Sequence, residues 1–156
     1  MSTPSQRLAE LGLTLPPVAA PQAAYVPAVR TGNYVYVSGQ LPFVDGKLQA
    51  VGKVGDGVSA EEAAALARLC ALNGLAAAAS VAGAGGLDAI TRIVKVTGFV
   101  ASVPSFTGQP AVINGASEFL IEVFGEDGKH ARSAIGVAEL PLNAPVEVEM
   151  IVEVRD

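Results

Sequence analysis

The fold is decided by the stretch Val146-Glu147-Val148-Glu149-Met150-Ile151-Val152-Glu153-Val154, near the C-terminus. Valine and glutamate alternate up to Glu149, which is the period of a half-buried strand, and Met150 and Ile151 interrupt the alternation. Residues 133–140 are also extended in character, and the proline-containing segment 140–145 indicates a turn. The sequence therefore predicts a β-hairpin with Arg132 near the start of its first arm and Glu147 on its second, both at the rim of one sheet.

Two long helices are predicted before this hairpin. Ser59-Ala60-Glu61-Glu62 is a capping box that begins a helix ending near Val81. A second helix is expected over 109–124, with Pro110 in its first turn and Gly125 directly after its end. The apolar stripe of the first helix is expected to contain Leu66, Leu69, Cys70, Asn73 and Ala77.

Shorter elements complete the chain. Thr3-Pro4-Ser5-Gln6 is a further capping-box pattern and predicts a short helix that ends at Gly12. Asp45-Gly46 is a hairpin signal, and Gly98 indicates a bulge or a close backbone neighbour inside a strand. β-branched and aromatic residues predict strands over 25–29, 34–38, 47–51 and 91–102.

The order of these elements predicts an α/β sandwich. Strands, a long helix, a strand, a long helix and two strands give two βαβ-type crossovers on one mixed sheet, with both helices on the same face. We expect a single domain over 1–156, in which 1–24 is an N-terminal extension carrying the short helix. The other sheet face is left bare, and only 16% of the residues are charged, so we expect an oligomer.

Composition argues against several classes of function. The net charge is −5 and no Lys/Arg cluster is present, while aromatic residues make up 5% and tryptophan is absent, so a nucleic-acid partner is not expected. With one cysteine and one histidine, an intramolecular disulfide is impossible and we expect no metal site. The N-terminus lacks the pattern of a signal peptide. The small apolar stretch 71–86 is short and is interrupted by Asn73 and four glycines, so it is not read as a membrane span, and we expect a cytoplasmic location.

One arginine and two glutamates are the main candidates for chemistry. The guanidinium of Arg132 matches a carboxylate in a bidentate manner, and the alternative is a surface arginine paired with Glu126 or Asp127. Glu147 and Glu149 share one face of the last strand, where they serve either as acid and base or as the solvated side of the sheet.

Other polar residues are weaker candidates. Tyr25, Ser38 and Asn114 lie at element boundaries, where sites are commonly built, and their alternative is an ordinary turn or cap residue. His130 follows a charged loop and is interpreted as a solvated loop residue. Cys70 is interpreted as a small core residue.

Several of these pieces together resemble the Rid/YjgF family of enamine/imine deaminases, which are also labelled L-PSP endoribonucleases. The resemblance covers about residues 25–155. It is carried by Tyr25, the turn Ser38-Gly39-Gln40-Leu41-Pro42, Asn114, Ala131-Arg132-Ser133, Leu140-Pro141 and the ending Val146-Glu147-Val148-Glu149.

The resemblance implies a chorismate-mutase-like sandwich in which three chains pack their sheets into a central barrel, with the helices outside and the sites in the clefts between subunits. It implies that Arg132 grips the carboxylate of a 2-imino or 2-enamino acid and that Glu147 positions or activates water. Tyr25, Ser38, Gly39 and Asn114 would line the cleft. The implied reaction is hydrolysis of the imine to a 2-keto acid and ammonia, without a metal or an organic cofactor.

The chain also departs from the family pattern. The deaminase branch commonly has a cysteine two residues after the arginine, whereas this chain has Ala134, whose backbone carbonyl would remain as the contact. A loop over 125–130 is inserted beside the expected carboxylate clamp. The alternatives are therefore a regulatory trimer that binds a small carboxylate without turnover and, against the acidic composition, a ribonuclease or translation inhibitor.

Overall fold

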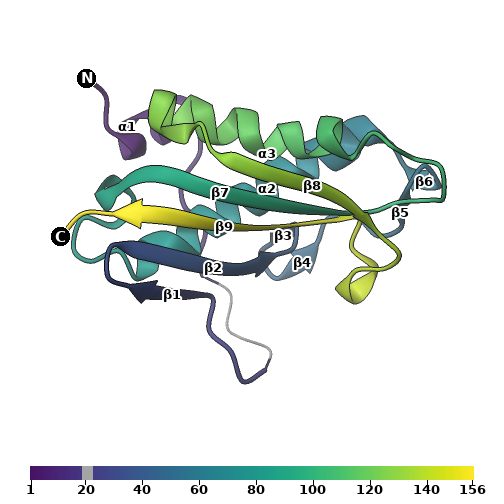
Figure 1. The fold of residues 1–156 in the computed structure, drawn as a ribbon, viewed down its shortest axis with the longest axis horizontal. Coiled ribbons are helices and arrows are strands. Elements are labelled where there is room, and N and C mark those ends of the chain that lie inside the picture. Colours follow the sequence, from purple (N-terminus) through teal and green to yellow (C-terminus); the bar gives the residue numbers. More distant parts are fainter. Residues whose placement is uncertain (19–22) are drawn as a thin grey trace.

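The computed structural model describes residues 1–18 and 23–156. Its centre is a five-stranded mixed sheet in which β7 and β8 run parallel and every other neighbouring pair is antiparallel (Figure 1). Residues 19–22, which belong to the expected N-terminal extension, lie outside the described residues. From one edge to the other, the strands are β1 (Ala28–Thr31), β2 (Tyr34–Gln40), β9 (Val146–Val154), β7 (Ile90–Ala101) and β8 (Ala131–Val137).

The predicted hairpin between the last two strands is wrong, because β7 lies between β8 and β9. β7 pairs with β8 along 95–101 and with β9 along 90–100, so it is hydrogen-bonded on both sides. A short 3-10 turn, η3 (Pro141–Asn143), lies on the connection from β8 to β9 past the end of β7. The hydrophobic pattern identifies the strands, but it does not identify their neighbours.

β9 alternates without a break, contrary to the expected interruption at Met150 and Ile151. Met150 is buried on the face covered by helices, and Ile151 is half-buried on the other face. The alternation of valine and glutamate ends at Met150, but the side chains still point to alternate faces of the sheet. An apolar residue therefore occurs on the face that the helices leave uncovered.

Both long helices pack on the same face of the sheet, as predicted (Figure 1). α2 (Ala60–Ser80) begins at Ser59, whose Oγ accepts a hydrogen bond of 3.0 Å from the backbone N of Glu62. α3 (Gln109–Phe124) ends at Gly125, which has a φ of 62°. The strands β2 and β7 are parallel with β9 between them, so α2 and α3 form the two expected crossovers.

The buried face of α2 differs from the predicted stripe. Leu66 and Leu69 are only half-buried, whereas the fully buried positions are mostly alanine. Small residues allow close approach: a Cβ placed on Gly115 of α3 would lie 1.9 Å from the backbone oxygen of Ala64. α2 is also long and apolar enough to cross a membrane, but half of it is buried inside the fold, as in the core helix of a globular domain.

The shorter elements follow the capping and turn signals. α1 (Pro4–Glu10) has the predicted capping box, and β1 begins at Ala28 rather than at residue 25. Gly98 approaches Ile113 of α3 closely, because an added Cβ would lie 2.3 Å from its Cδ1, and no bulge occurs at this glycine. The remaining short strands are β3 (Phe43–Val44), which forms the predicted hairpin with β4 (Lys47–Leu48), and the pair β5 (Lys53–Val54) and β6 (Gly57–Val58).

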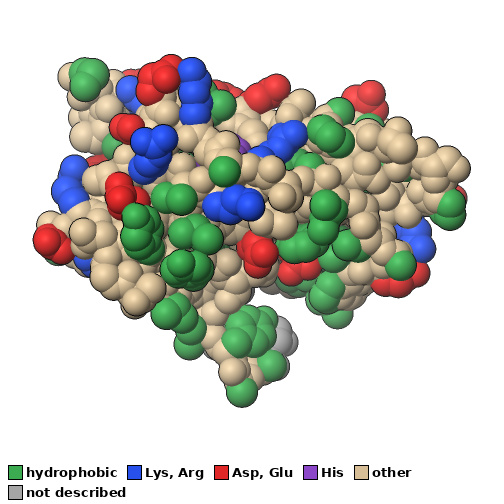
Figure 2. Space-filling model, in the orientation of Figure 1, with side chains coloured by type: hydrophobic (Ala, Val, Ile, Leu, Met, Phe, Trp, Pro, Cys, Tyr) green, Lys and Arg blue, Asp and Glu red, His purple; other side chains and the backbone are tan. Residues whose placement is uncertain are grey.

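The sheet face turned away from α2 and α3, called the open face below, carries exposed apolar side chains. Figure 2 shows hydrophobic side chains scattered among charged ones over this side of the molecule. The largest of them on the strands are Val29, Tyr34, Tyr36 and Ile135, which are 43–51% exposed. The structure therefore has the bare apolar face that the order of elements predicts.

Candidate active site

Arg132 lies on the edge strand β8 and is held by the neighbouring helix. Its Nη1 donates hydrogen bonds to Asn114 Oδ1 at 2.8 Å and to Ser117 Oγ at 3.3 Å, both on α3. The alternative of a surface ion pair is wrong, because Glu126 pairs with Lys129 instead and Arg132 forms no ion pair within residues 1–18 and 23–156. The structure thus brings together two of the predicted site residues, Arg132 and Asn114.

His130 is not the solvated loop residue that the sequence indicates. The preceding residues fold into the 3-10 turn η2 (Gly125–Gly128), and the ring of His130 reaches α3, where Nε2 lies 2.9 Å from Ser117 Oγ. Its Nδ1 lies 2.6 Å from the backbone oxygen of Gly128. Burial lowers the pKa of His130, the contact with Gly128 opposes this shift, and the charge of Arg132 lowers the pKa further.

Glu147 lies on the open face, in contact with the predicted residue Gly39. A Cβ added to Gly39 would lie 2.1 Å from Glu147 Oε1, so only glycine leaves room for this carboxylate. An irregularity between Val37 and Gln40 in the pairing of β2 with β9 places Gly39 there. Burial raises the pKa of the Glu147 carboxyl group, and the negative charge of Glu149 adds to this shift.

Ser38, a residue of β2, is hydrogen-bonded to the two residues that follow Tyr25 in the chain. Ser38 Oγ donates a hydrogen bond of 2.6 Å to the backbone oxygen of Val26, and its backbone N donates to Pro27 at 2.9 Å. Ser38 therefore fixes the segment that follows Tyr25, whose side chain is 51% exposed. The exposed side chain of Tyr25 is accessible to a ligand or to another chain.

Ala134 and Cys70 are mainly packing residues in this structure. Ala134 is half-buried and packs against the core, on the same face of β8 as Arg132. Cys70 is fully buried in α2, as expected, and burial raises the pKa of its thiol. In the described part of the chain, no group of three His, Cys, Asp or Glu side chains converges in a way that would hold a metal ion.

Arg132 and Glu147 do not meet within one chain. Val96 of β7 is paired with both Arg132 and Met150, so these three side chains share the face covered by the helices. Glu147 precedes Met150 by three residues and points to the open face. The strand spacing and rise place the Cα atoms of Arg132 and Glu147 roughly 14 Å apart. The candidate residues of each chain therefore form two separate groups, called candidate half-sites.

These half-sites are named by their residues. The arginine half-site consists of Arg132, Asn114, Ser117 and His130, at the sheet edge formed by β8. The glutamate half-site consists of Glu147, Gly39 and Ser38, on the open face. Ser117 and His130 were not among the predicted site residues, although Ser117 follows Asn114 by three positions and therefore shares its side of the helix.

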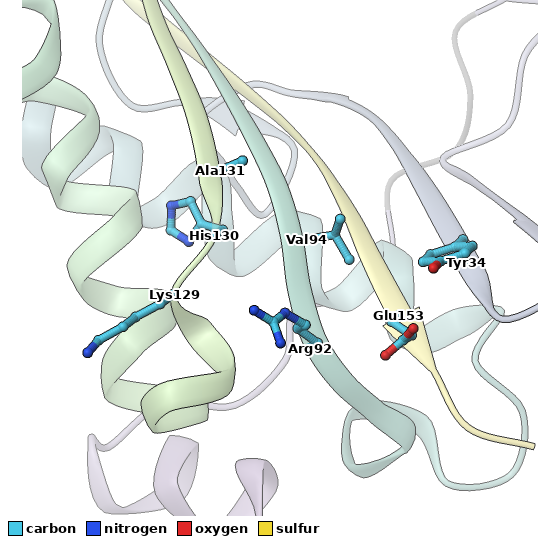
Figure 3. A pocket seen from close by; sticks show the side chains of 7 residues that line it. All are labelled: Tyr34, Arg92, Val94, Lys129, His130, Ala131 and Glu153. Carbon is cyan, nitrogen blue, oxygen red and sulfur yellow. The ribbon is translucent and has the colours of Figure 1, made fainter.

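A groove of about 490 Å³ lies elsewhere on the open face and contains none of the predicted site residues. Tyr34, Arg92 and Glu153 project over its floor, whereas the ring of His130 at its border turns towards α3 (Figure 3). A smaller groove of about 320 Å³ contains Ser38 and Glu149. This smaller groove borders the glutamate half-site, because Ser38 belongs to both.

Comparison with known proteins identifies the family. Residues 5–154 match the family model described as "YjgF/chorismate_mutase-like, putative endoribonuclease". The chain belongs to this family. The family resemblance and the mixed α+β fold predicted from the sequence are both confirmed.

Two curated relatives cover most of the chain. Protein TCP17 of Trypanosoma cruzi is 45% identical over 150 residues, which is 96% of this chain and 92% of that protein. A protein of Dermatophagoides farinae named 2-iminobutanoate/2-iminopropanoate deaminase is 33% identical over 143 residues, covering 92% of this chain and 95% of that protein.

Solved structures share the fold. A protein of unknown function from Agrobacterium tumefaciens has a TM-score of 0.89 and 48% identity, and the match covers 99% of this chain and 94% of that one. The TdcF protein of E. coli, solved with bound serine, has a TM-score of 0.61 and 27% identity, covering 91% and 94% of the two chains.

Proposed function

We propose that this YjgF-family protein hydrolyses small 2-imino or 2-enamino acids to 2-keto acids and ammonia, at a site completed by two chains. The observation that carries the proposal is the separation of a cationic half-site from an acidic one. Arg132 is held by neutral partners and keeps its charge for an anion, whereas Glu147 has a raised pKa, as is useful for exchanging protons with water.

The two half-sites have complementary roles in this reaction. Arg132 binds the substrate carboxylate through its planar guanidinium. Glu147 accepts a proton from water while the water oxygen bonds to C2 and the C=N electrons move to nitrogen. The proton is then returned to nitrogen, which gives a carbinolamine. Its hydroxyl proton moves to nitrogen by way of Glu147 as the C=O bond forms and the C–N bond breaks, and the 2-keto acid and ammonia leave. The imine carbon is already electrophilic, so orientation and a positioned water supply most of the catalysis.

A homotrimer is the assembly we propose for this site. Packing of the open faces around a central barrel would cover exposed side chains such as Tyr36 and Ile135. It would also bring the β8 edge of one chain, with Arg132, towards the open face of the next, with Glu147. We further propose that the enzyme works in the cytoplasm and needs no metal or organic cofactor.

The relatives support the proposal without deciding the substrate. The Dermatophagoides farinae relative carries the name of an imine deaminase, and the TdcF structure contains a small amino acid. A second candidate function, carboxylate binding without turnover, is favoured by Ala134 in the place of the family's cysteine. It uses the same Arg132 but has no need of Glu147.

A coupled assay tests the proposal. An amino-acid oxidase or a pyridoxal-phosphate dehydratase generates 2-iminopropanoate or 2-iminobutanoate, and the loss of imine is followed with and without the protein. We expect the wild type to accelerate the loss, Arg132→Ala to abolish the acceleration and Glu147→Ala to leave only a small residual rate, while the oligomer persists. A wild-type rate equal to the uncatalysed rate would refute the deaminase proposal. Binding of 2-oxobutanoate that survives Glu147→Ala in such a protein would favour the second candidate.

A further inference from the structure

The hydrogen bonds around His130 have a defined direction. A backbone carbonyl can only accept, so the 2.6 Å contact with Gly128 requires the proton of the neutral ring to be on Nδ1. Nε2 is then an acceptor, and the hydroxyl of Ser117, 2.9 Å away, donates to it. With its proton committed to His130, Ser117 Oγ presents lone pairs to Arg132.

Arg132 needs such acceptors, because a guanidinium only donates. Its Nη1 donates to Ser117 Oγ at 3.3 Å and to Asn114 Oδ1 at 2.8 Å. Both partners therefore hold the same nitrogen. Within the described residues, Nε and Nη2 of Arg132 donate to no other side chain, and these two donors match the two oxygens of a carboxylate.

The neutral state of His130 is favoured by its surroundings. The ring is half-buried between η2 and α3, and both burial and the nearby charge of Arg132 lower its pKa. A protonated ring would donate from Nε2 and would reverse the direction of the contact with Ser117. A solvated loop histidine would impose no direction on Ser117.

We propose that His130 and Ser117 are positioning residues that orient the Arg132 guanidinium for a ligand carboxylate. His130 sets the direction of the Ser117 hydroxyl, and Ser117 holds Nη1 so that Nε and Nη2 face the ligand. The inference rests on the proposed function in one respect, namely that Arg132 binds the carboxylate.

Steady-state kinetics with 2-iminobutanoate test this role. Carboxylate binding contributes equally to the ground state and the transition state, so its loss raises KM and leaves kcat nearly unchanged. We expect Ser117→Ala and His130→Leu each to raise KM by roughly three- to tenfold, the range for a lost hydrogen bond. His130→Gln, whose Oε1 accepts from Ser117, should restore most of the affinity.

Lys129→Ala is the matched control. It changes the residue next to His130 and removes an exposed ion pair with Glu126, but it leaves the contacts between His130, Ser117 and Arg132 in place. We expect its KM to equal that of the wild type. Unchanged KM values in Ser117→Ala and His130→Leu, in an active enzyme, would overturn the inference and leave the proposed function standing.

Nitrogen NMR tests the chain of hydrogen bonds independently of turnover. His130 is the only histidine in the sequence, so its ring signals need no assignment. At neutral pH we expect a neutral ring protonated on Nδ1, whose Nε2 signal shifts when 2-oxobutanoate is added to the wild type but not to Ser117→Ala. A ring protonated on Nε2, or an Nε2 signal that does not respond to Arg132→Gln, would overturn the inference even if the wild type proved inactive as a deaminase.

Discussion

Gly39→Ala provides a sharp test of the glutamate half-site. The added Cβ would lie 2.1 Å from Glu147 Oε1 and 2.9 Å from its Cδ, whereas ordinary contact begins at 3.4 Å. The carboxylate must therefore retreat by roughly 1.3 Å, and a misplacement of about 1 Å at a reacting centre costs up to about a hundredfold in rate. We expect kcat for 2-iminobutanoate to fall by about ten- to a hundredfold.

The same substitution should leave the fold nearly intact. The clashing atom is the end of a flexible, half-exposed side chain, and a shift of rotamer costs about 0.5–1.5 kcal/mol. Replacing a glycine inside a strand recovers about 0.5–1 kcal/mol of this cost. The two terms nearly cancel, so Tm should stay within about 3 °C of the wild type.

A double-mutant cycle identifies the route of the effect. If Gly39→Ala acts only by displacing the Glu147 carboxylate, it should change the residual rate by less than about twofold in a Glu147→Ala background. The displaced carboxylate is also more solvated, so the pKa of Glu147 should fall towards its ordinary value, which carbon NMR measures. The reasoning would be refuted if Gly39→Ala lowered kcat by the same factor in the Glu147→Ala background as in the wild type. An unchanged kcat in the single variant would also refute it.

Two further predictions concern packing and pH. Gly115→Ala should destabilise the protein by about 2 kcal/mol, or roughly 4–8 °C in Tm, because the new methyl group meets the backbone of α2. Gly74→Ala is the comparison: its methyl group meets only the flexible end of the Met150 side chain, so its stability should stay within about 1 kcal/mol of the wild type. Calorimetry measures both. Because folding raises the pKa of Glu147, the folded state binds more protons than the unfolded state between the ordinary and the raised pKa, and wild-type stability falls as pH rises through this window. Glu147→Gln should therefore be the more stable protein at pH 7 in urea unfolding, with the advantage shrinking below about pH 4, and equal stability of the two proteins at both pH values would contradict this assignment.

Local signals in the sequence predicted local structure well. The capping box at Thr3, the N-cap hydrogen bond of Ser59 and the terminal Gly125 set the helix ends, because a cap depends on residues only a few positions apart. The order of the strands in the sheet could not be predicted from such local signals. The partner of β9 was expected to be β8, yet the long strand β7 lies between them. The alternation of residues within one strand does not indicate which strand lies beside it.

The sequence yields candidate site residues but not their arrangement. Asn114 and Arg132 meet, and Gly39 and Glu147 meet, yet the two pairs lie on opposite faces of the sheet. Pairing through β7 sets this separation, so a sequence interpretation that placed β8 beside β9 put the pairs too close. The half-burial of His130 was not predicted, because it depends on η2 folding back against α3.

The separation of the half-sites makes a prediction that a single-chain site cannot satisfy. Arg132→Ala and Glu147→Ala chains should each be inactive or nearly so alone, but mixing them during refolding should restore activity. If each site takes Arg132 from one chain and Glu147 from its neighbour in a closed ring, a random equal mixture contains the intact combination at about a quarter of the sites. Restored activity should therefore approach about a quarter of the wild-type rate. A mixture of wild type with the double variant, in which both residues are replaced, is the matched control for assembly and dilution. If the site instead drew both residues from one chain, the first mixture would stay inactive while the second kept half of its activity, and the shared-site proposal would fail.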